Sequence, residues 1–389
     1  MSLTHDSCTC TGMVFICAET GGGRARAWLS QYRGRRPAFA CILSFTETAL
    51  IPQVSAVGKS AEARRYTAAA DGEFLLRGAS FAPQNSQARG LPPLSAGISP
   101  AVISRAVLQG RSIPIHLLST GLPFALNAPH IELPMVQGRS VETGRAMSEA
   151  QAKALFAAGQ AWGARLAPAN SYLIVGECVA GGTTTAQAVM SALGYDVTDR
   201  MSSSHREGNH RQKQALVNQG LAVWRSHAQP FADGLHPLAS NLSAISAAAA
   251  VGDPMQLVAA GMMLSASQVS GVLLAGGAQM LAVYALAKAI AQQNSIRWQA
   301  QRVVVGTTRW VIEDSHADTI VIARQTNAPY LASQIHFGRS PYMQLRAYEQ
   351  GFVKEGVGAG GCAIAAHLYK GWNQSQLRHA VEAELRHAF

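Results

Sequence analysis

Residues 171–186 read SYLIVGECVAGGTTTA, and this stretch predicts the fold of the chain. The apolar run 171–175 predicts a buried strand, residues 176–185 form a turn rich in glycine and threonine, and a helix is expected from Ala186. A glycine-rich turn between a strand and a helix directs backbone N–H groups toward a ligand at the positive end of the helix, where a phosphate binds. The stretch therefore predicts an α/β fold with an anion site at the end of a strand.

The same alternation recurs on both sides of this stretch. Further strands are expected at residues 13–18, 37–45, 113–119, 269–274, 303–307 and 319–323. Helices are expected at residues 25–32, 148–166, 207–221, 256–266, 279–291 and 344–351. Strands that alternate with helices and leave through Gly, Ser or Thr loops predict an α/β fold with a doubly wound, mostly parallel sheet (Rossmann-like).

The domain organisation expected from this pattern is simple. Residues 1–12 are polar and show no periodicity, so we expect a disordered extension there. Residues 13–389 are expected to form a single α/β domain, with a small helical subdomain built from the chain ends. No short repeat or low-complexity linker divides the chain.

Composition and charge restrict the class of partner. The chain has 389 residues, of which 48% are hydrophobic and 14% charged, and its net charge is +10. This charge favours anionic partners, but the positive residues are scattered and the densest cluster is Arg33, Arg35 and Arg36. Because no basic run interleaved with aromatic residues follows, we expect a phosphate ester as ligand rather than nucleic acid.

Cysteine usage and hydropathy favour a cytoplasmic protein. None of the six cysteines forms a CxxC pair, which is typical of reduced, buried thiols, and Cys178 is predicted to be a small packing residue. No apolar stretch reaches the length of a membrane helix, so no membrane partner is expected. Asp314 and His316 lie in one turn but are too few for a metal site, and neither a metal nor a cofactor is expected.

The turn after residue 175 resembles a P-loop without its lysine. Its spacing matches G-x-x-x-x-G-K-[ST], but Gly182 stands where an ATPase needs lysine on the β- and γ-phosphates. A monophosphate therefore fits the turn better than a nucleoside triphosphate. Glu177 lies inside the turn, and because an acid repels phosphate we expect it to face a sugar hydroxyl or a developing cation.

A second carboxylate stands in another glycine-rich turn. Lys354 and Glu355 precede residues 356–361, which read GVGAGG. A carboxylate held beside such a turn is able to take a proton from a ligand bound against the backbone. For Lys354 the residues leave two interpretations open, a phosphate contact or solvated charge. A third glycine pair, Gly276 and Gly277, follows the strand expected at 269–274.

Together these motifs resemble the nicotinate-nucleotide:dimethylbenzimidazole phosphoribosyltransferase family. The segments 176–185, 274–277 and 354–359 carry the resemblance, and residues 46–52, 252–256 and 346–351 are similar to a divergent, poorly characterised branch of that family. The resemblance covers roughly residues 13–370. It implies a phosphoribosyltransferase-like domain whose partners are nicotinate mononucleotide and an azole or purine base, and it implies a homodimer.

The resemblance also implies roles for individual residues. Glu355 corresponds to the family's catalytic glutamate, Glu177 to its second glutamate and Lys213 to a family lysine. The residues expected to bind substrate are Gly176, Gly181, Gly182, Thr183, Thr184, Gly276, Gly277, Gly356 and Gly358. In the implied reaction, a ring nitrogen of the base attacks the anomeric carbon of nicotinate mononucleotide, nicotinate leaves, and α-ribazole 5′-phosphate forms.

The sequence departs from the family pattern at Gly182, where the family has asparagine, and at Ala275, where it has an acidic residue. The N-terminal half, which supplies much of the base pocket in the family, matches poorly, so the acceptor base stays open. Ser99, Ser104 and Glu47 are candidates for contacts to the base. Two alternatives remain: a related base-exchange or hydrolase enzyme, and a non-enzymatic nucleotide-binding protein.

Overall fold

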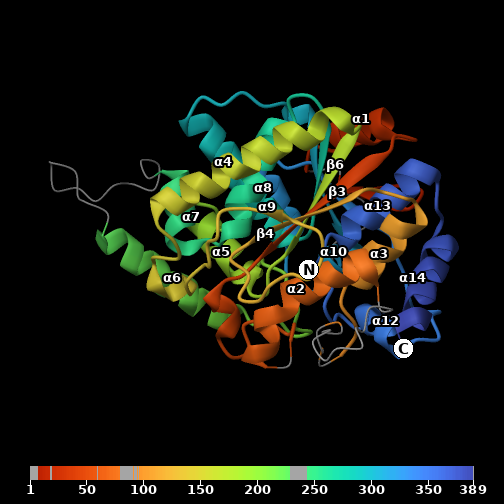
Figure 1. Cartoon of the computed structure of the whole chain (residues 1–389), viewed down its shortest axis with the longest axis horizontal. Helices are drawn as coiled ribbons and strands as arrows, with labels where there is room; N and C mark the ends of the chain where they lie inside the picture. Colours follow the sequence, from red (N-terminus) through yellow and green to blue (C-terminus); the bar gives the residue numbers. More distant parts are fainter. Residues whose placement is uncertain are drawn as a thin grey trace.

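A computed structural model describes residues 8–17, 20–58, 60–78, 91, 94, 96–227 and 243–388. One nine-stranded sheet runs through the molecule, with helices on both faces (Figure 1). The strands are β1 (Cys8–Thr11), β2 (Val14–Cys17), β3 (Pro37–Ser44), β4 (Ile115–Thr120), β5 (Ile131–Glu132), β6 (Tyr172–Cys178), β7 (Gly271–Ala275), β8 (Val303–Thr308) and β9 (Tyr330–Ser333).

The order of strands places a topological switch point at the centre of the sheet. The order is β1-β2-β9-β8-β7-β6-β3-β4-β5, and all pairs from β9 to β5 are parallel. From β3 the chain first builds outward to β4 and β5, and then returns to β6 on the other side of β3. Ligands of such sheets bind at the carboxyl ends of the strands beside this reversal. The α/β, doubly wound and mostly parallel sheet predicted from the sequence is confirmed.

The central strands are apolar on both sides because helices cover both faces. In β3, Ala38, Ala40 and Ile42 belong to one buried cluster, while Phe39 and Cys41 belong to the other. This continuous burial explains why the strands read as apolar runs rather than alternating patterns.

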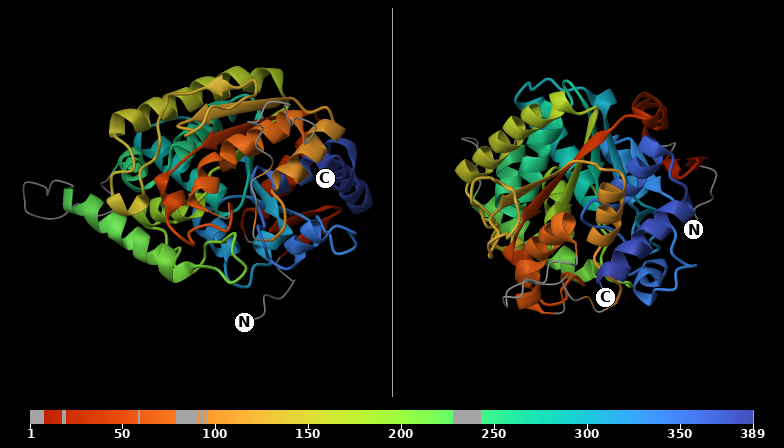
Figure 2. Two further views of the ribbon diagram at one scale, coloured as in Figure 1. Left: turned by 60° about the horizontal axis from the view of Figure 1, so that its bottom comes forward. Right: turned by 45° about the vertical axis from the view of Figure 1, so that its right-hand side comes forward.

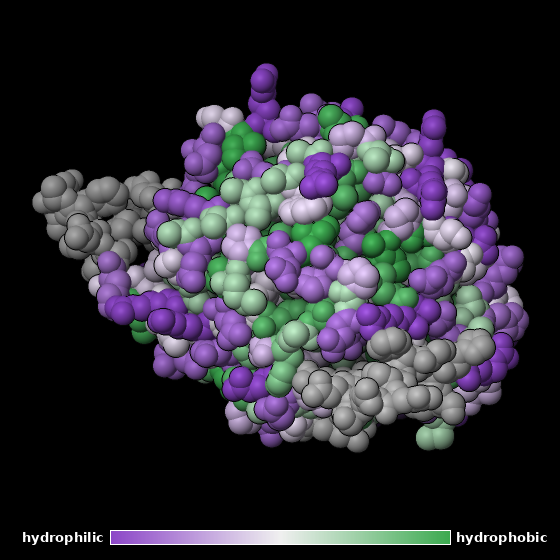
Figure 3. All heavy atoms as spheres, viewed as in Figure 1, coloured by the Kyte–Doolittle hydropathy of each residue, from purple (hydrophilic) through white to green (hydrophobic). Residues whose placement is uncertain are grey.

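The helices divide between the two faces, as the two views in Figure 2 show. The first face carries α4 (Glu149–Leu166), α5 (Gly182–Ala192), α6 (His210–His227), α7 (Ala244–Val251), α8 (Pro254–Ala266), α9 (Ala278–Gln293) and α11 (Thr319–Thr326). The second carries α1 (Gly22–Tyr32), α2 (Ala61–Arg77), α3 (Ala101–Gly110), α10 (Arg309–Ile312), α12 (Met343–Glu349), α13 (Ala359–Lys370) and α14 (Gln374–Ala388). In Figure 3, hydrophobic residues gather toward the middle of this face, and hydrophilic residues predominate at its edge.

One expected strand is a helix. Residues 319–323 begin α11, because Asp318 caps the helix by accepting a hydrogen bond from the backbone N–H of Val321 at 3.1 Å. The cap and burial on the first face outweigh the β-branched composition of the segment. The strand at this end of the sheet is β9, which was not predicted.

The N-terminal end of the chain also differs from expectation. Residues 8–11, within the extension expected over residues 1–12, form β1 and pair with β2, while residues 1–7 lie outside the described part of the chain. At the C-terminal end of the chain, α13 and α14 pack against α3. The N-terminal end supplies α1, which contacts α13, and also the edge strand β1 and its neighbour β2.

Two glycines allow α4 and α8 to touch at the backbone. A Cβ atom on Gly261 would lie 2.3 Å from the carbonyl oxygen of Phe156, and one on Gly159 would lie 2.2 Å from the carbonyl oxygen of Val258. Both contacts are far inside van der Waals distance and involve backbone, which cannot rotate away. The two helices therefore require glycine at their crossing.

We expect Gly261→Ala to lower the free energy of unfolding by about 1–3 kcal/mol, because the helices must separate to admit the methyl group. Gly23→Ala is the matched control, since a Cβ at Gly23 meets no atom within 4 Å. Thermal and urea unfolding of both variants measure the difference. Equal stability of the two variants would contradict the backbone contact.

Candidate functional site

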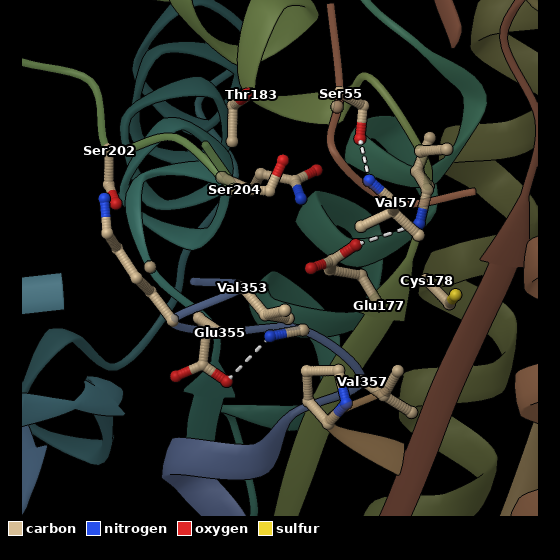
Figure 4. A pocket seen from close by; sticks show the side chains of 18 of the residues that line it. Ser55, Val57, Glu177, Cys178, Thr183, Ser202, Ser204, Val353, Glu355 and Val357 are labelled. Atoms are coloured by element: carbon tan, nitrogen blue, oxygen red, sulfur yellow. Dashed lines mark hydrogen bonds between the residues drawn. The ribbon is translucent and has the colours of Figure 1, made fainter. Parts of the chain in front are cut away.

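A pocket lies at the carboxyl ends of β6 and β7, beside the topological switch point (Figure 4). The end of β6 contributes Glu177 and Cys178, and the following turn lines the pocket up to Thr183 at the first turn of α5. Residues 202–204, residues 277–279 and the loop 353–357 also line it. The rest of the lining is Ser55, Val57, Thr67, Asp71, Leu94, Ser99, Pro100 and Val311. The pocket thus joins the three glycine-rich segments that the sequence analysis identified.

The loop from Val353 to Gly358 has an unusual backbone. The φ angles of Val353, Lys354 and Val357 are 66°, 62° and 52°. Positive φ is rare for β-branched residues and costs on the order of 1–3 kcal/mol per residue. The surrounding chain holds the loop: the N–H of Val357 donates to the carbonyl oxygen of Glu177 at 3.0 Å, which ties the loop to β6.

Glu355 is fixed by four hydrogen bonds. Its Oε1 accepts from the backbone N–H groups of Gly356 and Gly360, each at 3.1 Å. Its Oε2 accepts from the hydroxyl of Thr307 at 3.0 Å and from the N–H of Thr308 at 2.8 Å. Burial raises the pKa of Glu355 to about 7, although the four donors oppose this shift. A group with this pKa is able to accept a proton near neutral pH.

Glu177 is the second buried carboxyl group of the pocket. Its Oε2 accepts from the N–H of Val179 at 3.1 Å, and its side chain is also hydrogen-bonded by Gln279. Burial and the neighbouring carboxylates of Asp253 and Glu355 raise the pKa of Glu177 to about 8. The charged neighbours of this carboxyl group in the pocket are mainly negative, which disfavours its ionised form. A cation bound near Glu177 would have the opposite effect and lower its pKa.

Two buried lysines lie beside the loop 202–204. Lys354 forms an ion pair with Asp314 at 2.7 Å and donates to the carbonyl oxygen of His205 at 3.2 Å. Solvated charge, one of the two interpretations of Lys354, is therefore wrong, since its side chain is only 3% exposed. Lys213 is fully buried and its Nζ donates to the carbonyl oxygen of Ser202 at 3.3 Å. Burial and then the repulsion of Lys354 lower the pKa of Lys213 to about 7.

The structure brings most of the predicted site residues into the pocket wall. The wall includes Glu177, Glu355, Gly181, Gly182, Thr183, Gly277 and Gly356. The remaining predicted residues lie behind the wall, and these are Lys213, Gly176, Thr184, Gly276 and Gly358.

Two of the glycines behind the wall have a packing reason. A Cβ atom on Gly176 would lie 2.8 Å from the ring of Phe39, and one on Gly358 would lie 2.9 Å from the same ring. Phe39 of β3 therefore packs beneath both glutamate-bearing segments. Neither glycine contacts the pocket directly.

Asp71 of α2 lines the pocket and was not predicted from the sequence. It is buried, accepts hydrogen bonds from the hydroxyl of Ser99 at 2.6 Å and from the thiol of Cys178 at 3.2 Å, and stands in the alanine-rich segment 68–72. In the sequence, the one signal for this residue is an acid that directly follows three alanines. Among the three candidates for base contacts, Ser99 lines the pocket, Ser104 instead donates to the carbonyl oxygen of Val357, and Glu47 is exposed outside it.

The described part of the chain contains no group of three or more His, Cys, Asp or Glu side chains arranged to hold a metal ion. Cys17, Cys41, Cys178 and Cys362 are buried. Among the helices of residues 8–388 that the structure describes, none is long and apolar enough to cross a membrane.

The fold and the pocket define an α/β protein with a glycine-rich turn at the start of α5 beside the carboxyl groups of Glu177 and Glu355. A family model described as phosphoribosyltransferase matches residues 60–302. The chain is 52% identical to a UPF0284 protein of Cyanothece sp. over 359 residues, which cover 92% of this chain and 94% of that protein. A UPF0284 protein of Thermosynechococcus vestitus is 46% identical over 375 residues, or 96% of either chain. The chain belongs to this phosphoribosyltransferase family.

A solved structure has the same fold. It is the nicotinate-nucleotide-dimethylbenzimidazole phosphoribosyltransferase from Thermus thermophilus, with a TM-score of 0.55, 16% sequence identity, and coverage of 94% of this chain and 88% of that one. At this identity the match establishes the fold. The family resemblance noted from the sequence is confirmed by the family model and by the UPF0284 relatives.

The protonation of Glu177 predicts a pH-dependent stability. Folded Glu177 holds its proton up to about pH 8, whereas an unfolded glutamate releases it near pH 4.5. Between these values the folded state binds more protons, so the free energy of unfolding falls as pH rises. Glu177→Gln has no carboxyl proton at this position and so avoids this loss. We therefore expect the difference in melting temperature, variant minus wild type, to be larger at pH 8.5 than at pH 5 by at least about 2 °C.

Thermal unfolding at the two pH values measures this difference. The exposed residue Glu47 supplies the control variant Glu47→Gln, whose offset from wild type should not change with pH. A Glu177→Gln offset that is the same at both pH values would show that Glu177 is ionised in the folded chain.

Proposed function

We propose that this protein transfers the ribose 5-phosphate group of nicotinate mononucleotide onto a benzimidazole or purine base, the reaction that activates the lower ligand of a cobamide. The observation that carries the proposal is the presence of Glu355 and Glu177 in one pocket with the glycine-rich turn of α5. This reaction needs three elements: a catalytic base that accepts a proton, a carboxyl group near the sugar, and backbone N–H groups that bind the phosphate.

The 5′-phosphate is assigned to the turn before α5. Gly181 and Gly182 line the pocket there, and the N-terminal end of α5 favours an anion. Ser202, Ser203 and Lys354 line the same pocket and make this part of its wall polar. Ser202 and Lys354 both bond to Asp314, and Ser203 donates to Asn209. Lys213 supports this wall from behind, through its bond to the carbonyl oxygen of Ser202.

The chemical step follows from the position of the two glutamates. One imidazole nitrogen of the base attacks the anomeric carbon, and the bond from that carbon to nicotinate breaks, with its electron pair passing to the pyridine nitrogen. The proton on the other imidazole nitrogen passes to Glu355. Glu177 stabilises the positive charge that spreads over the ribose in the transition state, and the pyridinium charge of the bound nucleotide favours its ionised form.

Product analysis tests the proposal. Purified protein is incubated with nicotinate mononucleotide and either 5,6-dimethylbenzimidazole or adenine, and the nucleotide product is identified by mass and chromatography. Formation of an α-ribosyl 5′-phosphate with either base supports the transfer. Release of nicotinate without a base would indicate a hydrolase, and tight nucleotide binding without turnover would indicate a binding protein.

We expect Glu355→Gln to lower turnover by about 10²–10⁴-fold, because the amide keeps the shape of the side chain but cannot accept the proton. Binding of nicotinate mononucleotide, measured by calorimetry, should remain within a few-fold of wild type. Glu47→Gln serves again as the control, since Glu47 is exposed outside the pocket. Wild-type turnover in Glu355→Gln would exclude Glu355 as the base.

The pKa of Glu355 also predicts the pH profile. The carboxyl group must be ionised to accept a proton, so kcat/KM of the wild type should rise as pH increases through about 7. The residual activity of Glu355→Gln should lack this rise. A profile that falls through the same range would assign the proton transfer to another group.

The family resemblance also motivates two further proposals, a homodimer and a cytoplasmic location. Sedimentation of the purified chain tests the first.

A further inference from the structure

The pocket holds a third buried carboxyl group, Asp71, which the proposed reaction does not use. Among the described residues its hydrogen-bond donors are Ser99 and Cys178, and no lysine, arginine or histidine forms an ion pair with it. An ionised carboxylate has about four lone-pair positions, so two donors leave acceptor capacity open. Burial raises the pKa of Asp71 to about 6, against the effect of its two donors, and the group is therefore mainly ionised at neutral pH.

An unpaired, buried carboxylate is costly unless a ligand supplies a donor. Burying a charged acceptor without filling its hydrogen-bonding capacity destabilises the folded protein more than burying a neutral one does. Asp71 is 3% exposed overall, yet it forms part of the pocket wall, so its open side faces the cavity and not bulk water. Each oxygen of Asp71 has one protein donor, and its remaining lone pairs are able to accept from a ligand in the cavity.

The neighbours of Asp71 form an apolar slot suited to a flat ring. Pro100, Val357 and Leu94 line this part of the pocket. Gly356 lies against Pro100, since a Cβ atom at Gly356 would be 3.4 Å from the Cγ of Pro100. Aliphatic walls favour the faces of a heteroaromatic base, whose edge then meets the carboxylate.

Asp71 and Glu355 are anchored at the ends of two different strands. Asp71 accepts from Cys178 at the end of β6, and Glu355 accepts from Thr308 at the end of β8, with β7 between these strands. Neighbouring strands are about 4.8 Å apart, so the two anchor residues are separated by about 10 Å across the sheet. The two carboxyl groups therefore belong to different parts of one pocket wall, and a ligand between them is able to meet one with each edge.

We propose that Asp71 selects the acceptor base by accepting a hydrogen bond from an amino or hydroxyl group on the edge opposite the imidazole ring. The inference rests on the proposed transfer reaction and narrows its acceptor to bases with a donor on that edge. A base with methyl groups there would place apolar carbon against a buried charge and strip the carboxylate of water without compensation.

A pair of bases of nearly equal size tests this selection. In 5-aminobenzimidazole and 5-methylbenzimidazole, an amino donor replaces a methyl group at the same ring position. We expect wild type to use the amino compound with at least tenfold higher kcat/KM. Asp71→Asn keeps the side-chain shape and removes the charge, and it should bring the ratio close to one, mainly through a higher KM for the amino compound.

The matched control is Glu62→Gln, an exposed acid on the same helix whose ion pair with Arg65 lies at the surface. This variant should keep the wild-type ratio. Loss of activity by the same factor with both bases in Asp71→Asn would mean that Asp71 only supports the fold, through Ser99 and Cys178, and would overturn the selection. A wild-type preference for the methyl compound would overturn it as well, whether or not the variant folds.

Binding measurements separate this inference from the proposed reaction. If no base yields product, the transfer reaction fails, and the two bases are then titrated by calorimetry into wild-type protein saturated with nicotinate mononucleotide. Binding of the amino compound at least tenfold more tightly would still support recognition by Asp71. Equal affinities, or no binding of either base, would refute it.

Discussion

The pocket depends on the carboxylate of Glu355 and its four hydrogen-bond donors. These donors come from the end of β8 and from the segment that enters α13, so one side chain joins the sheet to the strained loop. Without it, the N–H groups of Gly356, Gly360 and Thr308 would lose their partner inside the protein, and the positive φ angles of Val353 and Val357 would lack a compensating interaction. The residue proposed as the base is thus also a structural support, which makes its geometry rigid before any ligand binds.

Burial of acids without matching cations characterises this site. Glu177, Asp71 and Glu355 all have raised pKa values, and in each case burial is the first cause. By contrast, the buried Lys354 has its own acid, Asp314. The carboxyl groups that line the cavity therefore lack an ion-pair partner. A ligand that brings a positive charge or a hydrogen-bond donor would stabilise them, and this favours its binding.

The sequence predicted the parts of this arrangement that depend on local pattern. The apolar runs of β3, β6, β7 and β8, and the turns that bear Glu177 and Glu355, follow from hydrophobicity and glycine spacing within a few residues. Asp71 could not be predicted in this way, because its position depends on how α2 packs above the end of β6. Lys354 was ambiguous for the same reason, since Asp314 is forty residues away in the chain. The strand predicted at residues 319–323 was wrong, because the composition of this segment allows a strand or a helix equally. The cap by Asp318 favours the helix.

Phe39 has a consequence for how this enzyme class can change. Its ring touches the backbone of both glutamate-bearing segments, yet it lies on a strand that contributes no side chain to the pocket wall there. The separation of the two glutamate-bearing segments therefore depends on the bulk of a side chain that does not line the pocket. A single exchange among aromatic and aliphatic residues at this position offers a way to change the shape of the cavity while every polar group stays the same.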